Sequence, residues 1–429
     1  MKKVKLGLIG FGTIGTGVVK TILKNNELIK KRRGIDLEFK YICDKDLKTY
    51  RNVEVEKELL VDDWKTVVDD DEIDIIIELV GGVDLPFQIV SQAIEKGKHV
   101  VTANKALLAA KGKDIYQAAV KNRTLLGLEA SVAGGIPIIR VIKESLVGDN
   151  IHAIYGIING TTNYILTKMI DDSMPFNQAL EMAQELGFAE ADPTLDINGG
   201  DAAAKITILA SLAFNTSINY EDVFVEGIEN IELLDVEYAY SMGYSIKLLA
   251  LTKLQVDESV EIRVHPCLVP LENSLASVKN EYNAISLDSE FLGNSMYYGK
   301  GAGSFPTASA VVADIVDLAE YVTSKAEYSH FKDMPHSDRE IRSINDIECR
   351  YYLRITTEDI PGVLANVLGI LAEKGISIAG VHQKETQGLY VHVIIVTYKA
   401  VEKDFKECVE RIDDMDSIKK ESVYYRLID

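Results

Sequence analysis

Short apolar runs alternate with helical patterns through residues 4–128, and this alternation constrains the fold more than any other feature of the chain. Strands are predicted at residues 4–9, 37–43, 73–78, 99–102 and 124–128. Helices are predicted at residues 14–25, 86–95 and 105–121. Such alternation places parallel strands in one sheet, and right-handed crossovers cover both of its faces. The sequence therefore predicts an α/β fold with a doubly wound parallel sheet.

A glycine-rich motif, GFGTIG at residues 10–15, follows the first predicted strand and opens the first predicted helix. In such a loop the first glycine makes a tight turn and the second admits a pyrophosphate. The third packs helix on strand, and the helix N-terminus faces the anion. We therefore expect a Rossmann-like NAD(P)-binding domain over residues 1–137. Its cofactor contacts are expected from Gly10, Gly12, Thr13, Ile14 and Gly15.

Asp44 ends the second predicted strand, where a carboxylate can bond the adenosine ribose and favour NAD. It lies somewhat beyond the usual spacing of ~20 residues from the glycine motif. Lys45 beside it could instead accept a 2′-phosphate. The choice between NAD and NADP therefore stays open.

The composition excludes some classes of partner. The 429 residues contain 66 Asp and Glu against 46 Lys and Arg, a formal net charge of -20. Such acidity argues against nucleic acid and against an anionic membrane surface. No segment approaches the ~20 apolar residues of a membrane span. The cysteines have neither metal-ligand nor redox spacing and suit a reducing cytoplasm.

One lysine interrupts an otherwise apolar helix that we predict at residues 201–212. The preceding segment, residues 192–201, is polar and acidic, whereas residues 202–210 read AAAKITILA. Lys205 therefore has little surface to turn toward water. Asp201 lies one helical turn earlier on the same face. Lys205 is either half of a structural ion pair or a proton donor and acceptor, because burial lowers the pKa of a lysine.

Two other loops follow predicted strands at the sheet edge where ligands bind in open α/β folds. Lys105 follows the fourth strand, where it can reach cofactor or substrate, or simply begin a helix in solvent. Glu129 opens a loop of small residues after the fifth strand. One carboxylate with free carbonyls suits a monovalent cation, and it suits a plain tight turn equally well.

An acidic cluster surrounds Lys205 in sequence and can bind a substrate ammonium, or it can be a solvated loop before a helix. Its members are Glu190, Asp192, Asp196 and Asp201. A second glycine-rich loop, residues 299–303, opens a helix predicted at residues 306–322. We expect this helix to return to the nucleotide domain.

The rest of the chain divides into a middle region, a linker and a tail. Residues 138–323 are expected to form an α+β domain, with strands at 151–158, 247–254 and 261–268 and helices at 162–171, 177–186 and 238–249. Residues 324–348 are polar and are expected to be a linker. Residues 349–429 follow a βαββαβ, ferredoxin-like order, with strands at 350–356, 378–384, 389–396 and 418–426 and helices at 362–373 and 401–412.

Several of these segments together resemble the homoserine dehydrogenase family. They are GIINGTTNYI at 156–165, EADP at 190–193, NGGDAAAK at 198–205 and the stretch from 301 to 314. The resemblance covers residues 3–322 in order, and residues 349–429 resemble an ACT domain, a regulatory amino-acid-binding module. The combination resembles the long monofunctional enzymes, and we do not expect the bifunctional form with an aspartokinase segment.

The resemblance implies NAD(P)-dependent interconversion of L-homoserine and L-aspartate 4-semialdehyde, a step toward threonine and methionine. It implies that Lys205 moves the alcohol proton, with Lys105 close to the same oxygen and Asp201 orienting Lys205. Further implied contacts to substrate or nicotinamide come from Glu190, Asp196, Asp201, Thr161 and Gly303. A sodium or potassium ion is implied at Glu129 and the carbonyls of Val132, Gly134 and Ile136.

The resemblance also implies regulation and assembly. An amino-acid effector, threonine first, is expected at the strand–helix turn of the tail, near Asp359, Gly362, Val363 and Leu364. A cytoplasmic homo-oligomer, dimer or tetramer, is expected. The alternatives are another semialdehyde or amino-acid dehydrogenase, and an amino-acid sensor with an inactive dehydrogenase. The Asp201–Lys205 pair argues against the sensor.

Overall fold

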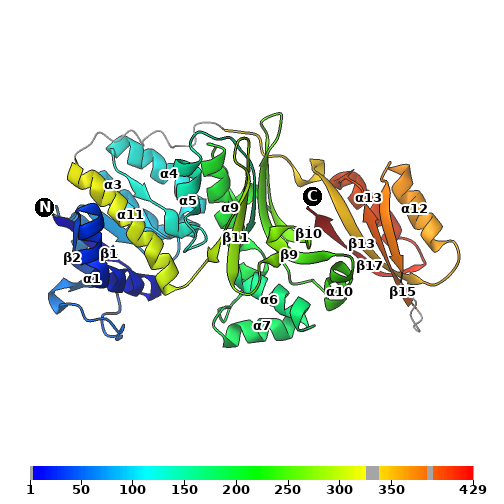
Figure 1. Ribbon diagram of the computed structural model, residues 1–429, viewed down its shortest axis with the longest axis horizontal. Helices are drawn as coiled ribbons and strands as arrows, with labels where there is room; N and C mark the ends of the chain where they lie inside the picture. Colours follow the sequence, from blue (N-terminus) through cyan, green and yellow to red (C-terminus); the bar gives the residue numbers. More distant parts are fainter. Residues whose placement is uncertain (1–2, 325–337, 384–389, 429) are drawn as a thin grey trace. The chain divides into compact units, whose positions relative to one another are not determined.

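The computed structural model describes residues 3–324, 338–383 and 390–428 (Figure 1). The chain forms two compact units, and each draws on separate stretches of sequence. The first unit comprises Met1–Gly160, Asp201–Val223 and Glu281–Arg339. The second comprises Thr161–Gly200, Phe224–Asn280 and Glu340–Asp429.

The first unit contains the predicted doubly wound sheet, with six parallel strands in the order β3-β2-β1-β4-β5-β6. The strands are β1 Lys3–Ile9, β2 Asp36–Cys43, β3 Leu60–Val61, β4 Ile75–Glu78, β5 His99–Thr102 and β6 Leu126–Gly127. The helices are α1 Thr13–Arg33, α2 Trp64–Asp69, α3 Asp84–Glu95, α4 Lys105–Asn122 and α11 Ser304–Ser324. The short elements β3 and α2 were not predicted from the sequence.

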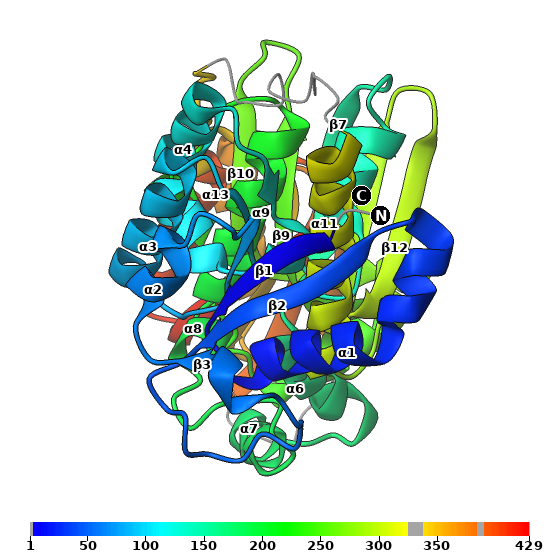
Figure 2. The same cartoon turned by 90° about the vertical axis from the view of Figure 1, so that its left-hand side faces the viewer.

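The sheet buries both of its faces, as parallel sheets do. In β4, Ile75 and Ile77 pack with α1 and α11, whereas Ile76 faces the opposite way and packs with α2, α3 and α4. Figure 2 shows these two groups of helices on opposite sides of β1 and β2. Helix α11 does lie on α1, where Ser304 donates from its Oγ to the carbonyl of Thr13 at 2.8 Å. The glycine-rich start of α1 therefore lies beside the start of α11.

Three antiparallel strands in the order β12-β11-β7 also belong to the first unit. They are β7 Ile151–Ile157, β11 Tyr282–Ser289 and β12 Gly293–Lys300. The sequence did not predict β11 and β12. In β12, half-buried and exposed residues alternate with no fully buried position, so its apolar pattern is weak.

The second unit joins the C-terminal module to an earlier hairpin in the strand order β9-β10-β17-β13-β15-β14. The hairpin strands are β9 Tyr244–Leu254 and β10 Val260–Pro270. The module has the predicted βαββαβ order: β13 Glu348–Glu358, α12 Val363–Glu373, β14 Ile378–Gln383, β15 Tyr390–Thr397, α13 Glu402–Asp413 and β17 Ile418–Leu427, with β16 at Ala400–Val401. Both helices pack on one face of its strands (Figure 1). Strand β17 runs parallel to β10, with Arg426 opposite Cys267.

Before the hairpin, the second unit contains short helices and one short strand. These are α6 Gly160–Asp171, α7 Phe176–Glu185, α8 Thr194–Ile197, β8 Phe224–Val225 and α10 Leu233–Ser241. Within residues 3–324, 338–383 and 390–428, no helix is both long and apolar enough to cross a membrane.

The helix predicted at residues 238–249 is wrong beyond Ser241, whereas the overlapping strand predicted at residues 247–254 lies within β9. Helix α10 ends at Ser241, Gly243 has a φ of +86°, and β9 begins at Tyr244. Most of β9 is buried on both faces, so no alternation marks it as a strand, and a short apolar run alone does not separate helix from strand. Part of the expected linker also pairs with the hairpin, because the N–H of Val260 donates to Glu340 at 2.8 Å. Residues 325–337 of that linker, and residues 384 and 389 of two predicted strands, lie outside the described part of the chain.

Candidate active site

The N-terminal part of helix α9 (Gly200–Ala213) holds Asp201 and Lys205, one turn apart, as an ion pair. The Nζ of Lys205 donates to Oδ2 of Asp201 and to the carbonyl of Ile158, both at 2.7 Å. The lysine side chain is only 11% exposed. Both acceptors therefore fix the ammonium at the point where β7 ends and α9 begins.

A second lysine shares the same carboxylate. Lys105, the first residue of α4, places its Nζ 2.7 Å from Oδ1 of Asp201 and remains 43% exposed. The side-chain amide of Asn159 donates to Oδ2 of Asp201 at 2.8 Å. Burial would raise the pKa of Asp201, but the two ammonium groups outweigh burial and hold this pKa far below its usual value. The buried carboxylate of Asp201 thus contacts two ammonium groups, and the side chain of Lys105 is more exposed than that of Lys205.

Asn159 was not singled out in the sequence, although it lies inside the motif at 156–165. Asparagine in a loop is usually a turn residue, and no periodic pattern marks it. Its contact with Asp201 exists only because the end of β7 reaches the start of α9.

The glycine-rich loop has the backbone form that a pyrophosphate requires. Gly10 has a φ of +103°, and a Cβ there would lie 2.6 Å from the carbonyl of Leu79. A Cβ at Gly15 would lie 2.1 Å from the carbonyl oxygen of Gly10. Gly12 faces open space and precedes Thr13 and Ile14, which begin α1. A phosphate can therefore approach the backbone N–H groups at this helix start.

Asp44 has a different neighbourhood from the predicted one. Its carboxylate accepts the N–H of Phe11 at 2.7 Å and that of Asp46 at 2.9 Å. Arg51, which the sequence did not suggest, lies 3.5 Å from Oδ1 of Asp44 and above the ring of Phe11. The ribose end of the candidate cofactor site thus carries a cation as well as a carboxylate.

The second glycine-rich loop lies beside the first one. Gly303 has a φ of +112° and precedes Ser304, which bonds the carbonyl of Thr13. A side chain on Gly301 would collide with Asn283, at 2.0 Å from its amide nitrogen. Gly303 therefore lies next to a residue that contacts Thr13, the first helical residue of the glycine-rich motif.

The Glu129 loop fits a monovalent cation only in part. The carboxylate of Glu129 accepts the N–H groups of Ile139 and Arg140 at 2.9 and 2.8 Å, and burial raises its pKa. Val132 and Gly134 are buried, and the carbonyl of Ile136 accepts the N–H of Ile138. Among the residues described, no group of three or more His, Cys, Asp and Glu side chains is placed to hold a metal. A cation here would depend on backbone carbonyls, with Glu129 bracing the loop.

Thr161 and Asp196 meet within the second unit. The hydroxyl of Thr161 donates to the carbonyl of Phe188 at 2.6 Å and lies 3.2 Å from Oδ2 of Asp196. Asp192 accepts the N–H and the hydroxyl of Thr194 at 3.1 and 2.6 Å, so its carboxylate has a local structural use. Glu190 is exposed at the surface of this segment.

A third lysine, Lys247 in β9, was not singled out in the sequence, where the helix predicted at residues 238–249 and the strand predicted at residues 247–254 overlap. Its side chain is buried, and its Nζ donates to Oδ1 of Asn163 at 3.1 Å and to the carbonyl of Val278 at 2.5 Å. Burial lowers the pKa of Lys247 to about 7. These contacts hold helix α6, which carries Thr161, against the segment after the hairpin.

The predicted effector residues lie at the turn between β13 and α12. Asp359 is exposed, and Gly362 has a φ of +97° immediately before the helix. Val363 is buried and Leu364 is partly buried in the core of the module. The turn has the geometry expected of any strand–helix connection with an open helix N-terminus.

Glu78 is a buried acid at the end of β4, close to the glycine-rich loop in the sheet. It accepts the hydroxyl of Thr102 and the N–H of Val80, both at 2.6 Å, and burial raises its pKa to about 7. Folding therefore binds a proton in the window from about pH 4.5 to pH 7, and stability falls as the pH rises through that window.

The substitution Glu78→Gln removes the loss of stability that comes from ionising this buried carboxyl group. We expect it to raise the free energy of unfolding by about 1–3 kcal/mol at about pH 8 and by much less at about pH 5. Denaturant unfolding at the two pH values measures the difference. The exposed Glu95→Gln is the control. An equal gain from Glu78→Gln at both pH values would show that its charge is not the cause.

Three family models match the chain. The model described as homoserine dehydrogenase matches residues 137–316, and its NAD-binding domain matches residues 10–129. An ACT domain model matches residues 351–416. The homoserine dehydrogenase of Neisseria gonorrhoeae is 39% identical over 434 residues, covering 100% of this chain and 99% of its own length. The chain belongs to the homoserine dehydrogenase family.

Solved members of this family have the same fold. A homoserine dehydrogenase from Thiobacillus denitrificans superposes with a TM-score of 0.95 at 39% identity, over 100% of this chain and 99% of that one. The Staphylococcus aureus enzyme at pH 7.5 gives a TM-score of 0.77 at 32% identity, over 100% and 99%. A hyperthermophilic archaeal homoserine dehydrogenase in complex with NADPH covers 76% of this chain and 99% of its own, with a TM-score of 0.63 at 26% identity. The protein is accordingly an oxidoreductase with an NAD(P)-binding domain and a C-terminal ACT domain.

Proposed function

We propose that this homoserine dehydrogenase uses Lys205 as the group that takes and returns the alcohol proton during NAD(P)-dependent interconversion of L-homoserine and L-aspartate 4-semialdehyde. The observation that carries the proposal is the shared carboxylate of Asp201, which holds Lys205 and Lys105 at 2.7 Å each. Lys205 is the more buried of the two, which suits a group that must change its protonation state.

A nicotinamide cofactor held by the glycine-rich loop before α1 would supply the hydride acceptor for oxidation of the alcohol carbon of homoserine. During oxidation of homoserine, the neutral amine of Lys205 takes the hydroxyl proton. In the reverse reaction, the ammonium of Lys205 returns a proton when the aldehyde is reduced. The more exposed ammonium of Lys105 stabilises the negative charge that develops on the oxygen. Asp201 balances the charge of the two lysines and keeps both ammonium groups in place.

Substrate binding is proposed for the acids of the second unit. Asp196, bonded by Thr161, and the exposed Glu190 offer negative charge for the ammonium of homoserine. Asp201, already paired with two lysines, is better suited to orienting Lys205 than to binding an ammonium.

A steady-state assay tests the activity. The purified full chain is mixed with L-homoserine and either NAD⁺ or NADP⁺, and the absorbance of the reduced nicotinamide is followed. The reverse reaction with L-aspartate 4-semialdehyde is the second measurement. Reduction of cofactor only in the presence of homoserine is expected. No reduction with either cofactor would leave the sensor alternative.

We also propose that the ACT domain binds an amino-acid effector, threonine first, at the turn from Asp359 to Leu364. The open N-terminus of α12 supports an anionic or zwitterionic ligand there. The assay is repeated with L-threonine on the full chain and on a chain ending before Glu348. Inhibition of both forms alike would place the effector elsewhere.

Three further proposals concern the assembly, the cellular location and a bound cation. A dimer or tetramer is proposed from the family alone, and light scattering of the purified protein measures it. A cytoplasmic location is proposed because Cys43, Cys267, Cys349 and Cys408 are all free and buried. A sodium or potassium ion is proposed at the carbonyls of the Glu129 loop, and a comparison of activity in each chloride salt tests it.

Arg51 is proposed to favour NADP over NAD. An arginine at the ribose end of such a site accommodates a 2′-phosphate, and Asp44 is already bonded to Phe11 and Asp46. We expect Arg51→Ala to raise the KM for NADP⁺ about 10-fold and to change the KM for NAD⁺ about twofold at most. Lys45→Ala is the comparison variant, because the sequence suggested Lys45 as the residue that accepts the 2′-phosphate. Equal losses with both cofactors in Arg51→Ala would mean that Arg51 only supports the loop.

A further inference from the structure

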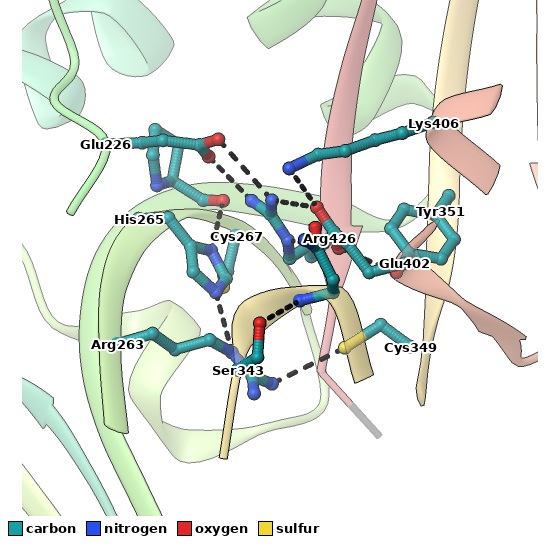
Figure 3. Close-up of polar contacts among 12 residues, drawn as sticks. Glu226, Arg263, His265, Cys267, Ser343, Cys349, Tyr351, Glu402, Lys406 and Arg426 are labelled. Carbon is teal, nitrogen blue, oxygen red and sulfur yellow. Dashed lines mark hydrogen bonds and ion pairs between the residues drawn. The ribbon is translucent and has the colours of Figure 1, made fainter. Parts of the chain in front are cut away.

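A buried arginine of the ACT domain bonds two carboxylates that come from different parts of the second unit (Figure 3). Arg426 in β17 is 1% exposed. Its Nε donates to Oε2 of Glu402 at 2.9 Å, and its Nη1 donates to Oε2 of Glu226 at 2.6 Å. Glu402 belongs to α13 of the ACT domain, whereas Glu226 directly follows β8. Arg426 therefore ties the ACT domain to the segment after β8.

The two carboxylates are not equivalent. Glu402 is fully buried and also accepts the hydroxyl of Tyr351 at 2.7 Å, with Lys406 3.1 Å from its Oε1. Burial would raise the pKa of Glu402, but the hydrogen bond and charge of Arg426, together with Tyr351 and Lys406, outweigh burial and lower this pKa. The Glu226 side chain is 38% exposed. Loss of Glu226 would thus leave Arg426 paired with Glu402 inside the ACT domain. Loss of Arg426 would instead leave the buried carboxylate of Glu402 without its arginine partner.

The backbone around Glu226 supports the segment that carries Asp196. The N–H of Glu226 donates to Val264 of β10 at 2.8 Å, and the N–H of Ile228 donates to the carbonyl of Ile197 at 2.8 Å. Gly227 between them lies so close to this segment that a Cβ would be 2.4 Å from the oxygen of Ile197. Residues 226–228 therefore form a seat for helix α8, which contains Asp196.

We propose that Glu226 is a positioning residue for the substrate, held in place by Arg426 of the ACT domain. Arg426 fixes the side chain of Glu226, residues 226–228 then fix Ile197, and Asp196 keeps its place beside Thr161. The ACT domain thereby contributes to substrate affinity even before an effector binds. This inference rests on the proposed function, in which Asp196 binds the ammonium of homoserine.

The test is a comparison of KM and kcat in the full chain. Glu226→Ala is expected to raise the KM for homoserine about 5- to 10-fold, with kcat and the KM for the cofactor changed about twofold at most. Glu226→Gln keeps a hydrogen-bond acceptor for Arg426 and is expected to lie between the wild type and Glu226→Ala. A general loss of folding would instead change all three constants and the melting temperature.

Glu232→Ala is the matched control. Glu232 is also a partly exposed glutamate that bonds a buried arginine of the ACT domain, Arg354, at 3.0 Å. Arg354 keeps a second carboxylate, Asp235, at 2.6 Å. Because Glu232 stands at the start of α10 and not at the seat for α8, its loss is expected to leave the KM for homoserine within about twofold. Equal KM changes in Glu226→Ala and Glu232→Ala would overturn the proposal.

Two further variants separate this inference from the function on which it rests. The added Cβ in Gly227→Ala pushes directly on Ile197, so we expect a larger rise in the KM for homoserine than in Glu226→Ala. An unchanged KM would contradict the support of helix α8 by residues 226–228. Asp196→Asn tests the substrate contact itself. If Asp196→Asn raises the KM and Glu226→Ala does not, the inference fails alone. If Asp196→Asn leaves the KM unchanged, the proposed substrate contact fails, and the inference fails with it.

Discussion

Lys205→Met is expected to lower kcat for homoserine oxidation by about 10²- to 10⁴-fold, the range associated with loss of a general acid–base group. Methionine has a similar volume but cannot take a proton. Asp201 keeps Lys105 and Asn159 as partners in this variant, so the site should stay folded. The glycine-rich loop and Arg51 are untouched, so the dissociation constant for the reduced cofactor should stay within about twofold of the wild type. Steady-state kinetics and fluorescence titration of the cofactor measure the two quantities.

Lys168→Met is the control for this prediction. Lys168 is also a helical lysine paired with an aspartate four residues away, Asp172, at 2.9 Å, but it belongs to α6 and its side chain is 25% exposed. Its replacement should leave kcat unchanged. Retention of a kcat within about threefold of the wild type by Lys205→Met would refute the proton-transfer role and favour a purely structural pair.

Asp201→Asn is expected to shift the pH dependence of homoserine oxidation to lower pH. The carboxylate stabilises the ammonium forms of both lysines, and an uncharged amide of the same shape does not. The base should then become neutral at a lower pH, so that the pH of half-maximal kcat falls by about 1–2 units. The maximal kcat should also fall at least about 10-fold, because both ammonium groups lose the acceptor that orients them.

A pH–rate profile of the variant beside the wild type checks both expectations. Asp172→Asn supplies the comparison, since it removes the carboxylate from an exposed ion pair of similar length. A half-maximal pH that stays constant or rises in Asp201→Asn would mean that Asp201 does not govern the reacting base.

The sequence predicted the main features of the candidate site because they lie within short stretches of chain. The GFGTIG motif and the alternation around it indicate the nucleotide domain, and Asp201 and Lys205 are neighbours on one helix face. Helix periodicity alone brings such a pair together, and the observed Nζ–O distance of 2.7 Å agrees with it. The βαββαβ order of the tail was also readable, since its elements are separated by clear turns.

The contacts of other residues were not predicted, because their partners are far away in the sequence. Lys247 lies where the predicted helix at 238–249 and the predicted strand at 247–254 overlap, and only the pairing of β9 with β10 decides in favour of the strand. Arg51 stands in a polar loop without periodicity, and nothing in that loop shows that it approaches Asp44 and Phe11. Glu226 looks like an ordinary surface acid until Arg426 bonds it from 200 positions away.

Periodicity, turn chemistry and glycine spacing act over a few residues, so they suffice for the fold class, the cofactor loop and the Asp201–Lys205 pair. The joining of Lys105 to Asp201, the seat of Asp196 on residues 226–228 and the tie through Arg426 depend on contacts between distant segments. Such contacts form because burying a charge or a backbone group requires a partner, wherever in the chain that partner lies. Only the folded chain decides which partner it is.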